Sequence, residues 1–116
     1  MATLNMAVSH ALDQLEEDLG LDADELAGAL AVSARSLERW RSGETYPQRE
    51  ARRRLETLIE LNARLREMFD SQDAIRMWMH GSNRYLRGLK PAEAAKVGRL
   101  DLITATLDAL DAGIFI

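Results

Sequence analysis

Arginine is concentrated in one part of the chain, with seven residues of this type between positions 35 and 54. A guanidinium group forms bidentate hydrogen bonds with phosphates and with the edge of guanine, so such a cluster is typical of a surface that binds DNA. Arg35 and Arg39 are four residues apart and would share one helix face, from which they can reach base edges. Ser36 can contact a base or a phosphate. The residues suited to phosphate contacts, which set register without reading sequence, are Arg41, Arg49, Arg52 and Arg53.

The distribution of charge supports this interpretation better than the net charge of −4 does. Residues 1–34 contain seven acidic residues and no Lys or Arg, residues 35–54 contain seven Arg and three Glu, and residues 55–116 contain eight basic and nine acidic residues. One basic segment in an acidic chain is expected where a single surface meets phosphate. A basic helix face that is merely solvated is the alternative, and charge alone does not decide between the two.

The segment 23–42 has the pattern of a helix-turn-helix, which would position the first of these arginines. Two helices that cross steeply need a small residue at their contact, and Ala27 supplies it. The apolar residues that can fill the angle, and are therefore predicted to face inward, are Leu26, Leu30, Val32, Leu37 and Trp40. Ser33 can cap the second helix. The pattern resembles the helix-turn-helix of Xre-type regulators, whose second helix enters the major groove, although the turn carries Ala31 where many of them have glycine.

Further helices are predicted along the whole chain, and no segment alternates as a strand would. We expect helices over about 4–19, 23–30, 34–42, 48–69, 72–80, 91–98 and 100–112, with a turn at 82–90. The apolar stripe of the first helix suits either the core or a dimer contact. The predicted buried face of the long helix consists of Ala51, Leu55, Leu58, Ile59, Leu65 and Phe69. The chain is therefore predicted to be all-α, with a helix-turn-helix domain and long connecting helix at 1–69 and a small helical unit at 70–116.

Groups for catalysis or metal binding are scarce. The chain has two histidines, His10 and His80, without ligand spacing, and it has no cysteine and no glycine-rich phosphate loop. Glu16 and Glu17 point in different directions on a helix, so they do not converge on a substrate. We therefore expect no enzymatic activity, no metal and no cofactor. The start of the chain lacks the features of a signal peptide and no apolar run approaches the ~20 residues that span a membrane, so we expect a cytoplasmic protein.

The run from Ser71 to the end carries the most diagnostic pattern. A tryptophan on a helix is followed by Asn-x-x-Leu-x-Gly-x-x-Pro, then by Gly, then by an apolar helix that ends in Gly. This run resembles the toxin-binding domain of Xre/MbcA/ParS antitoxins, most of all their MbcA-type members. With the helix-turn-helix upstream, the resemblance covers about residues 23–116. The matching residues are Trp78, Asn83, Leu86, Gly88, Pro91, Gly98, Leu107 and Gly113. Trp78, Asn83, Gly88 and Pro91 are expected to be structural.

The resemblance implies a cognate toxin with a RES domain, an NAD-consuming protein whose active-site entrance this chain would block. It also implies homodimers, larger toxin–antitoxin assemblies and binding to operator DNA. Exposed Ile114, Phe115 and Ile116 would be unfavourable in water, so we expect this tail either to contact the toxin or to fold back on the chain's own core. Arg84, Tyr85 and Arg87 are further predicted toxin contacts, because Tyr and Arg are favoured in interface hot spots; an ordinary solvated loop is the alternative.

Two other functions fit the same pattern. One is a stand-alone helix-turn-helix repressor without a toxin. The other is an adaptor that binds protein and keeps a helix-turn-helix without DNA contacts.

Overall fold

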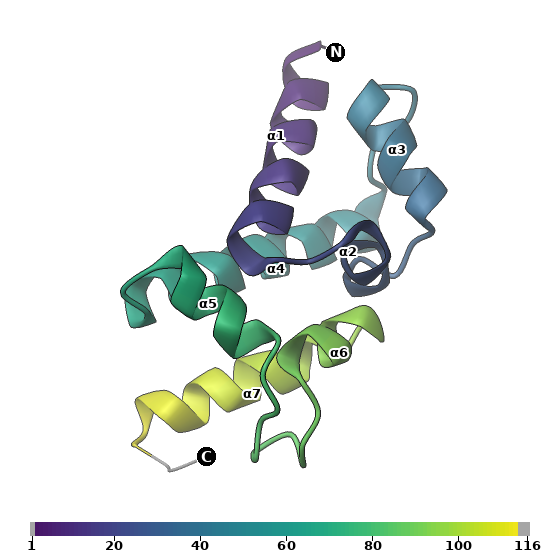
Figure 1. Cartoon of the computed structure of the whole chain (residues 1–116). Coiled ribbons are helices and arrows are strands. Elements are labelled where there is room, and N and C mark those ends of the chain that lie inside the picture. The colour runs from purple at the N-terminus through teal and green to yellow at the C-terminus, as the bar shows by residue number, and fades with distance from the viewer. Residues whose placement is uncertain (1, 114–116) are drawn as a thin grey trace.

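A computed structural model describes residues 2–113, and the side chains of residues 7–113 (Figure 1). The described part is all helical and contains no strand, which confirms the predicted fold class. Its helices are α1 (Ala2–Leu19), α2 (Ala23–Ala29), α3 (Ala34–Ser42), α4 (Arg49–Met68), α5 (Gln72–Met79), α6 (Pro91–Lys96) and α7 (Leu100–Asp111). The bounds lie within two residues of those predicted, because the residues that begin and end helices act locally.

Side chains just ahead of three helices fix where those helices begin. The Ser33 hydroxyl accepts a hydrogen bond from the Ser36 amide at 3.1 Å, and the Ser71 hydroxyl accepts one from the Ala74 amide at the same distance. Asp22 accepts from the backbone of the third residue of α2, whose own carboxylate accepts from the Asp22 amide. Each cap satisfies amides that have no partner in the first turn, which stabilises a helix by about 1 kcal/mol.

A single hydrophobic core joins the two halves of the chain. Leu12, Leu15 and Leu19 of α1 are buried in it, so the structure assigns this part of the α1 stripe to the core. Residues of every other helix complete the same cluster. Figure 1 shows the arrangement that makes this possible: α1 stands on α4, while α5, α6 and α7 close the opposite side. The predicted division between residues 1–69 and residues 70–116 is therefore a division of the sequence, and the two parts share one core.

The face that α4 buries differs from the prediction at Ile59, Leu61 and Asn62. Ile59 was expected inside, but its side chain is 42% exposed, whereas Leu61 and Asn62 are buried. The Asn62 amide nitrogen donates to the Asp18 carboxylate of α1 at 2.9 Å, so this polar residue has a partner where α1 crosses. Apolar character alone predicted Ile59 to be buried. The direction from which α1 covers α4 turns Asn62 inward and Ile59 outward.

The backbones of α2 and α6 come into direct contact at Gly28. A Cβ atom at Gly28 would lie 1.9 Å from the carbonyl oxygen of Lys96, so no larger residue fits without moving one of the helices. The turn that follows α6 is also held by α4, because Arg54 donates from Nη1 to the Gly98 carbonyl at 3.0 Å. The first helix of the helix-turn-helix is therefore fixed directly to the C-terminal half.

Candidate functional site

Helices α2 and α3 form the predicted helix-turn-helix. Leu37 and Trp40 are buried, as predicted, and they hold α3 against the core. Ala31 adopts a left-handed conformation with φ of 58°, which is the conformation that glycine supplies in many such turns. The Val32 amide donates to the Ala27 carbonyl at 3.0 Å and closes the turn. An alanine thus makes the turn at a modest conformational cost.

The outer face of α3 presents Arg35, Ser36 and Arg39. Arg35 is exposed, and the Arg39 side chain is 41% exposed with its Nε 4.0 Å from the Glu44 carboxylate. The Ser36 hydroxyl lies 3.1 Å from that of Ser33. A weak ion pair in water leaves Arg39 available to another partner, since such pairs contribute little. The two arginines and the serine between them therefore form a polar surface that can meet nucleic acid.

Arg41 does not face outward with Arg35, Ser36 and Arg39. Its guanidinium group forms ion pairs with Asp13 and Glu16 of α1, and only 29% of its side chain is exposed. The sequence pattern placed Arg41 among the outward residues suited to phosphate contacts, but the acidic face of α1 takes up this cation. In the structure Arg41 joins α3 to α1.

A second basic surface lies where α4 begins. Arg49, Arg52 and Arg53 are exposed there, around an open hollow of about 510 Å³. The guanidinium carbon of Arg52 lies 5.6 Å from the centre of the Tyr46 ring, in a cation–π contact that orients the side chain. The neighbouring Arg54 turns inward to Gly98 instead. These three exposed arginines are among the four that the sequence pattern assigns to phosphates, the fourth being Arg41.

The segment between α5 and α6 is a closed loop whose conformation is set by Asn83. The buried Asn83 side chain accepts a hydrogen bond from the Tyr85 amide at 2.9 Å. Its backbone carbonyl accepts from Gly88 at 2.8 Å, and its amide donates to the Leu89 carbonyl at 3.0 Å. Arg87 and Gly88 both have positive φ, 58° and 92°. The structural role predicted for Asn83 is confirmed, and so is that of Gly88.

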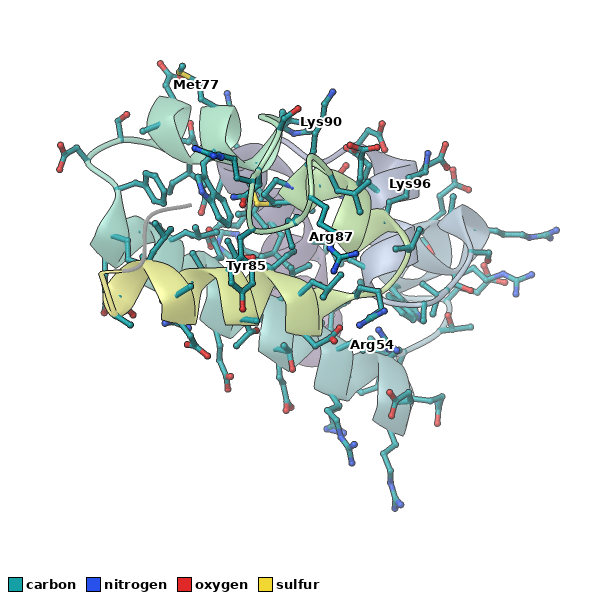
Figure 2. All side chains as sticks on the ribbon, turned by 90° about the horizontal axis from the view of Figure 1, so that it is seen from below. Arg54, Met77, Tyr85, Arg87, Lys90 and Lys96 are labelled. Atoms are coloured by element: carbon teal, nitrogen blue, oxygen red, sulfur yellow. The ribbon has the colours of Figure 1, made fainter. Side chains whose placement is uncertain are left out.

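This loop leaves the predicted contact residues on the surface. Arg84, Tyr85 and Arg87 are all exposed. Figure 2 looks onto the loop from below and shows Tyr85 and Arg87 in front of the helices, with the Tyr85 side chain over α7. The other predicted contacts, Ile114, Phe115 and Ile116, lie outside the described residues.

The N-terminal end of the C-terminal half is anchored on α1 through contacts that the sequence did not predict. The His80 Nε2 atom lies 2.8 Å from the Gly20 carbonyl oxygen, and Arg76 Nε donates to the Glu17 carbonyl at 2.7 Å. Trp78, which the sequence predicts to be structural, packs against the core, with the centre of its ring 5.9 Å from that of Phe69. His80 therefore serves to join α5 to the end of α1.

Asp18 is the centre of a polar cluster that joins α1, α4 and α5. Its carboxylate accepts hydrogen bonds from Asn62 and from Gln72, each at 2.9 Å, and lies 3.9 Å from Arg66. Burial acts to raise the pKa of Asp18, but the hydrogen bonds from Asn62 and Gln72 and the charge of Arg66 together hold the pKa below its ordinary value. These residues are 44 to 54 positions from Asp18, and no local pattern could have paired them.

The fold and its surfaces define an all-helical helix-turn-helix protein with a small C-terminal helical unit, and comparisons with known proteins specify its family. Residues 64–113 match the Antitoxin Xre/MbcA/ParS C-terminal toxin-binding domain. The chain is 34% identical over 100 residues to "Mycobacterial cidal antitoxin MbcA" of Mycobacterium tuberculosis and of Mycobacterium bovis, spanning 86% of this chain and 88% of each relative. The chain belongs to the Xre/MbcA/ParS antitoxin family, as its sequence pattern indicated.

A solved structure resembles the fold as a whole. It is the crystal structure of the M. tuberculosis MbcT–MbcA toxin–antitoxin complex, which matches with a TM-score of 0.65 and 31% sequence identity over 93% of this chain and 96% of that one. The relatives are named as antitoxins and not as enzymes. None of the helices in the described residues is long and apolar enough to cross a bilayer.

Proposed function

We propose that this chain is the antitoxin of a toxin–antitoxin pair and neutralises a cognate toxin by binding it through α5 to α7 and the loop between α5 and α6. The observation that carries the proposal is the relationship to MbcA over most of both chains, together with the structural match to an antitoxin in complex with its toxin. The toxin-binding domain of the family corresponds to residues 64–113, which include that loop.

We propose that this chain acts in the cytoplasm, and that its toxin is an NAD-consuming protein with a RES domain whose active-site entrance this chain covers. Arg84, Tyr85 and Arg87 are the proposed contacts among the described residues, because all three are exposed on a loop whose backbone is held by Asn83. The tail 114–116 remains a proposed contact from the sequence alone.

We further propose that the chain regulates its own operon as a homodimer. Arg35, Ser36 and Arg39 of α3 would meet base edges, and Arg49, Arg52 and Arg53 at the start of α4 would meet phosphates. The four exposed arginines, Arg35, Arg49, Arg52 and Arg53, and the 41% exposure of the Arg39 side chain support the proposal. A dimer suits it as well, because a helix-turn-helix protein reads two half-sites with two copies of its recognition helix. Arg41 is left out of the proposed surface, since Asp13 and Glu16 pair with it.

Co-expression tests the central proposal. A neighbouring gene for a RES-domain protein is expected; induction of that protein should arrest growth, and expression of this chain from a second promoter should restore it. The double variant Arg35→Ala/Arg39→Ala is a matched control, because it removes the proposed base contacts and leaves the C-terminal half unchanged. It should neutralise as well as the wild type does. Growth arrest that persists with both proteins at equal levels would contradict the proposal.

A further inference from the structure

The C-terminal half contains a second basic segment. It is not apparent from the net charge of residues 55–116, because eight basic residues there are offset by nine acidic ones. Between Arg84 and Arg99 the chain has five basic residues and one acidic residue, a net charge of +4 in a chain whose total is −4. These residues surround α6: residues 84–90 precede the helix and residues 96–99 follow it. We call these two stretches the α6 rim. The basic residues of the rim are Arg84, Arg87, Lys90, Lys96 and Arg99.

Four of these five cations are not neutralised within the described part of the chain. Arg84, Arg87, Lys90 and Lys96 are exposed, and none forms an ion pair with a side chain that the structure describes. Arg99 alone is paired, 2.9 Å from the Asp101 carboxylate. Elsewhere among the described residues, two arginines at helix contacts are matched with acids: Arg41 has two carboxylate partners, and so does Arg64. The rim therefore presents positive charge that the fold itself does not use.

The rim also exposes apolar surface. Of the five large apolar side chains that are exposed among the described residues, Tyr85, Leu89 and Val97 belong to the rim, and Val97 is 71% exposed. A fourth, Met77 of α5, is 76% exposed. Figure 2 shows Met77, Lys90 and Lys96 projecting along one edge of this face. Aliphatic and aromatic side chains among arginines and lysines are the composition of a protein interface, because apolar burial contributes most to its affinity.

The backbone of the rim is already ordered without a partner. Hydrogen bonds to both backbone groups and the side chain of Asn83 close the loop, and the Glu93 carboxylate accepts from the Lys90 amide at 3.0 Å as α6 begins. The left-handed conformation of Arg87 is part of that closed loop. A surface held in this way loses little conformational entropy when it binds, so its charges and apolar groups can act together on one partner.

We propose that the α6 rim docks an acidic surface of the cognate toxin, with Leu89 and Val97 entering apolar hollows among the toxin's carboxylates. This inference rests on the proposed function and adds the chemistry of the partner. An acidic protein is favoured over a nucleic acid, because Leu89 and Val97 offer nothing to a phosphate backbone. Positive charge on the rim of an acidic antitoxin accelerates the encounter with the toxin and orients it, so the association rate depends on salt.

Stopped-flow association with the purified toxin tests the inference. Between about 50 and about 300 mM NaCl the association rate constant of the wild type should fall roughly tenfold or more. The triple variant Arg84→Glu/Arg87→Glu/Lys90→Glu should associate at least about tenfold more slowly in low salt, and its rate should no longer fall as salt is added. Lys90→Glu/Lys96→Glu leaves Arg87 and its positive φ unchanged, and it should slow association in the same direction. Thermal unfolding followed by circular dichroism verifies that each variant is folded.

The matched control reverses the same number of charges on the other basic segment. Arg49→Glu/Arg52→Glu/Arg53→Glu should bind toxin with nearly the rate of the wild type, which would show that position and not total charge is responsible. Equal association rates for wild type and both folded rim variants would overturn the inference while leaving the proposed function intact. A wild type that binds no toxin at any salt concentration would overturn both. Rim variants that bind toxin normally but lose operator DNA in a gel shift would assign the rim to nucleic acid and would also overturn it.

Discussion

The molecule has two basic segments of equal net charge, and they differ in what accompanies the charge. Residues 35–54 and residues 84–99 each carry +4. The first segment contains none of the large exposed apolar side chains, whereas the second contains three of them. The first therefore has the composition of a surface that meets phosphate, and the second that of a surface that meets protein. Charge alone does not identify a partner; the exposed apolar side chains beside it distinguish the two segments.

The two segments also differ in how the backbone carries them. The arginines of the first segment lie on helices α3 and α4, which present them at the spacing of one turn. The cations of the second lie mainly on a loop whose conformation depends on Asn83 and on the positive φ of Arg87. Helical positions suit the regular repeat of DNA, while an irregular loop can be shaped to one protein surface. Substitutions in and between the two segments should show whether they act independently.

The largest effect is expected at Gly28, because one substitution there should disturb the packing of α2 against α6 and thereby destabilise the helices that carry both segments. In Gly28→Ala the new Cβ would overlap the Lys96 carbonyl, which lies 1.9 Å from its position, so α2 and α6 must separate. We expect the free energy of unfolding to fall by about 3 kcal/mol, measured by urea denaturation. Glu60→Ala, on the exposed face of α4, is the control and should change it by less than about 0.5 kcal/mol. A variant as stable as the wild type would show that the two halves are not joined at this contact.

The next largest effect should show that the first segment binds operator DNA and the second does not. Arg35→Ala and Arg39→Ala are each expected to weaken specific operator binding by about 1–3 kcal/mol, because each removes a proposed base contact. Gel shifts with the operator and with unrelated DNA measure the loss of specificity. Arg84→Ala is the matched control on the other segment and should leave the shift unchanged. If operator binding survived the loss of both Arg35 and Arg39, α3 would not be the recognition helix.

A smaller effect should show that Arg41 differs from its neighbours. Arg41→Ala removes two ion pairs with α1 that are only partly exposed, so the free energy of unfolding should fall by about 1 kcal/mol. Non-specific DNA binding should change little, since the guanidinium group is turned to Asp13 and Glu16. Denaturation curves and gel shifts on the same preparation provide both measurements. A large loss of DNA affinity at unchanged stability would show that Arg41 contacts DNA.

The smallest effect concerns the pH dependence of the cluster at Asp18, whose residues belong to neither basic segment. Because the folded-state pKa of Asp18 is lowered below the ordinary value of 3.8, the unfolded chain binds the proton more tightly than the folded chain does. The stability contributed by the ionised carboxylate is therefore present above pH 3.8 and is lost as the pH falls through the folded-state pKa. Wild type should be more stable than Asp18→Asn at neutral pH, and the difference should shrink in acid. Asp70→Asn is the exposed control, and a difference independent of pH would contradict the assignment.

The fold was predictable to a large extent because its signals are local. Asp22, Ser33 and Ser71 cap helices through bonds that reach three residues along the chain, and Leu37 and Trp40 are buried at helical spacing. The site was less predictable. Arg35 and Arg39 are on the surface as expected, yet nothing in their sequence surroundings distinguishes them from Arg41, which is held by acids 25 and 28 residues away.

The amino-acid sequence by itself determined the helices, the helix-turn-helix and the family, since caps, apolar periodicity and the Asn-x-x-Leu-x-Gly-x-x-Pro run act over short distances. Only the tertiary structure decided which cations remain free, which face of α4 is buried and that α2 touches α6 at Gly28. The physical reason is that these features depend on pairs of groups far apart in the chain. Their partners are chosen by the direction in which whole helices pack, which no short segment contains.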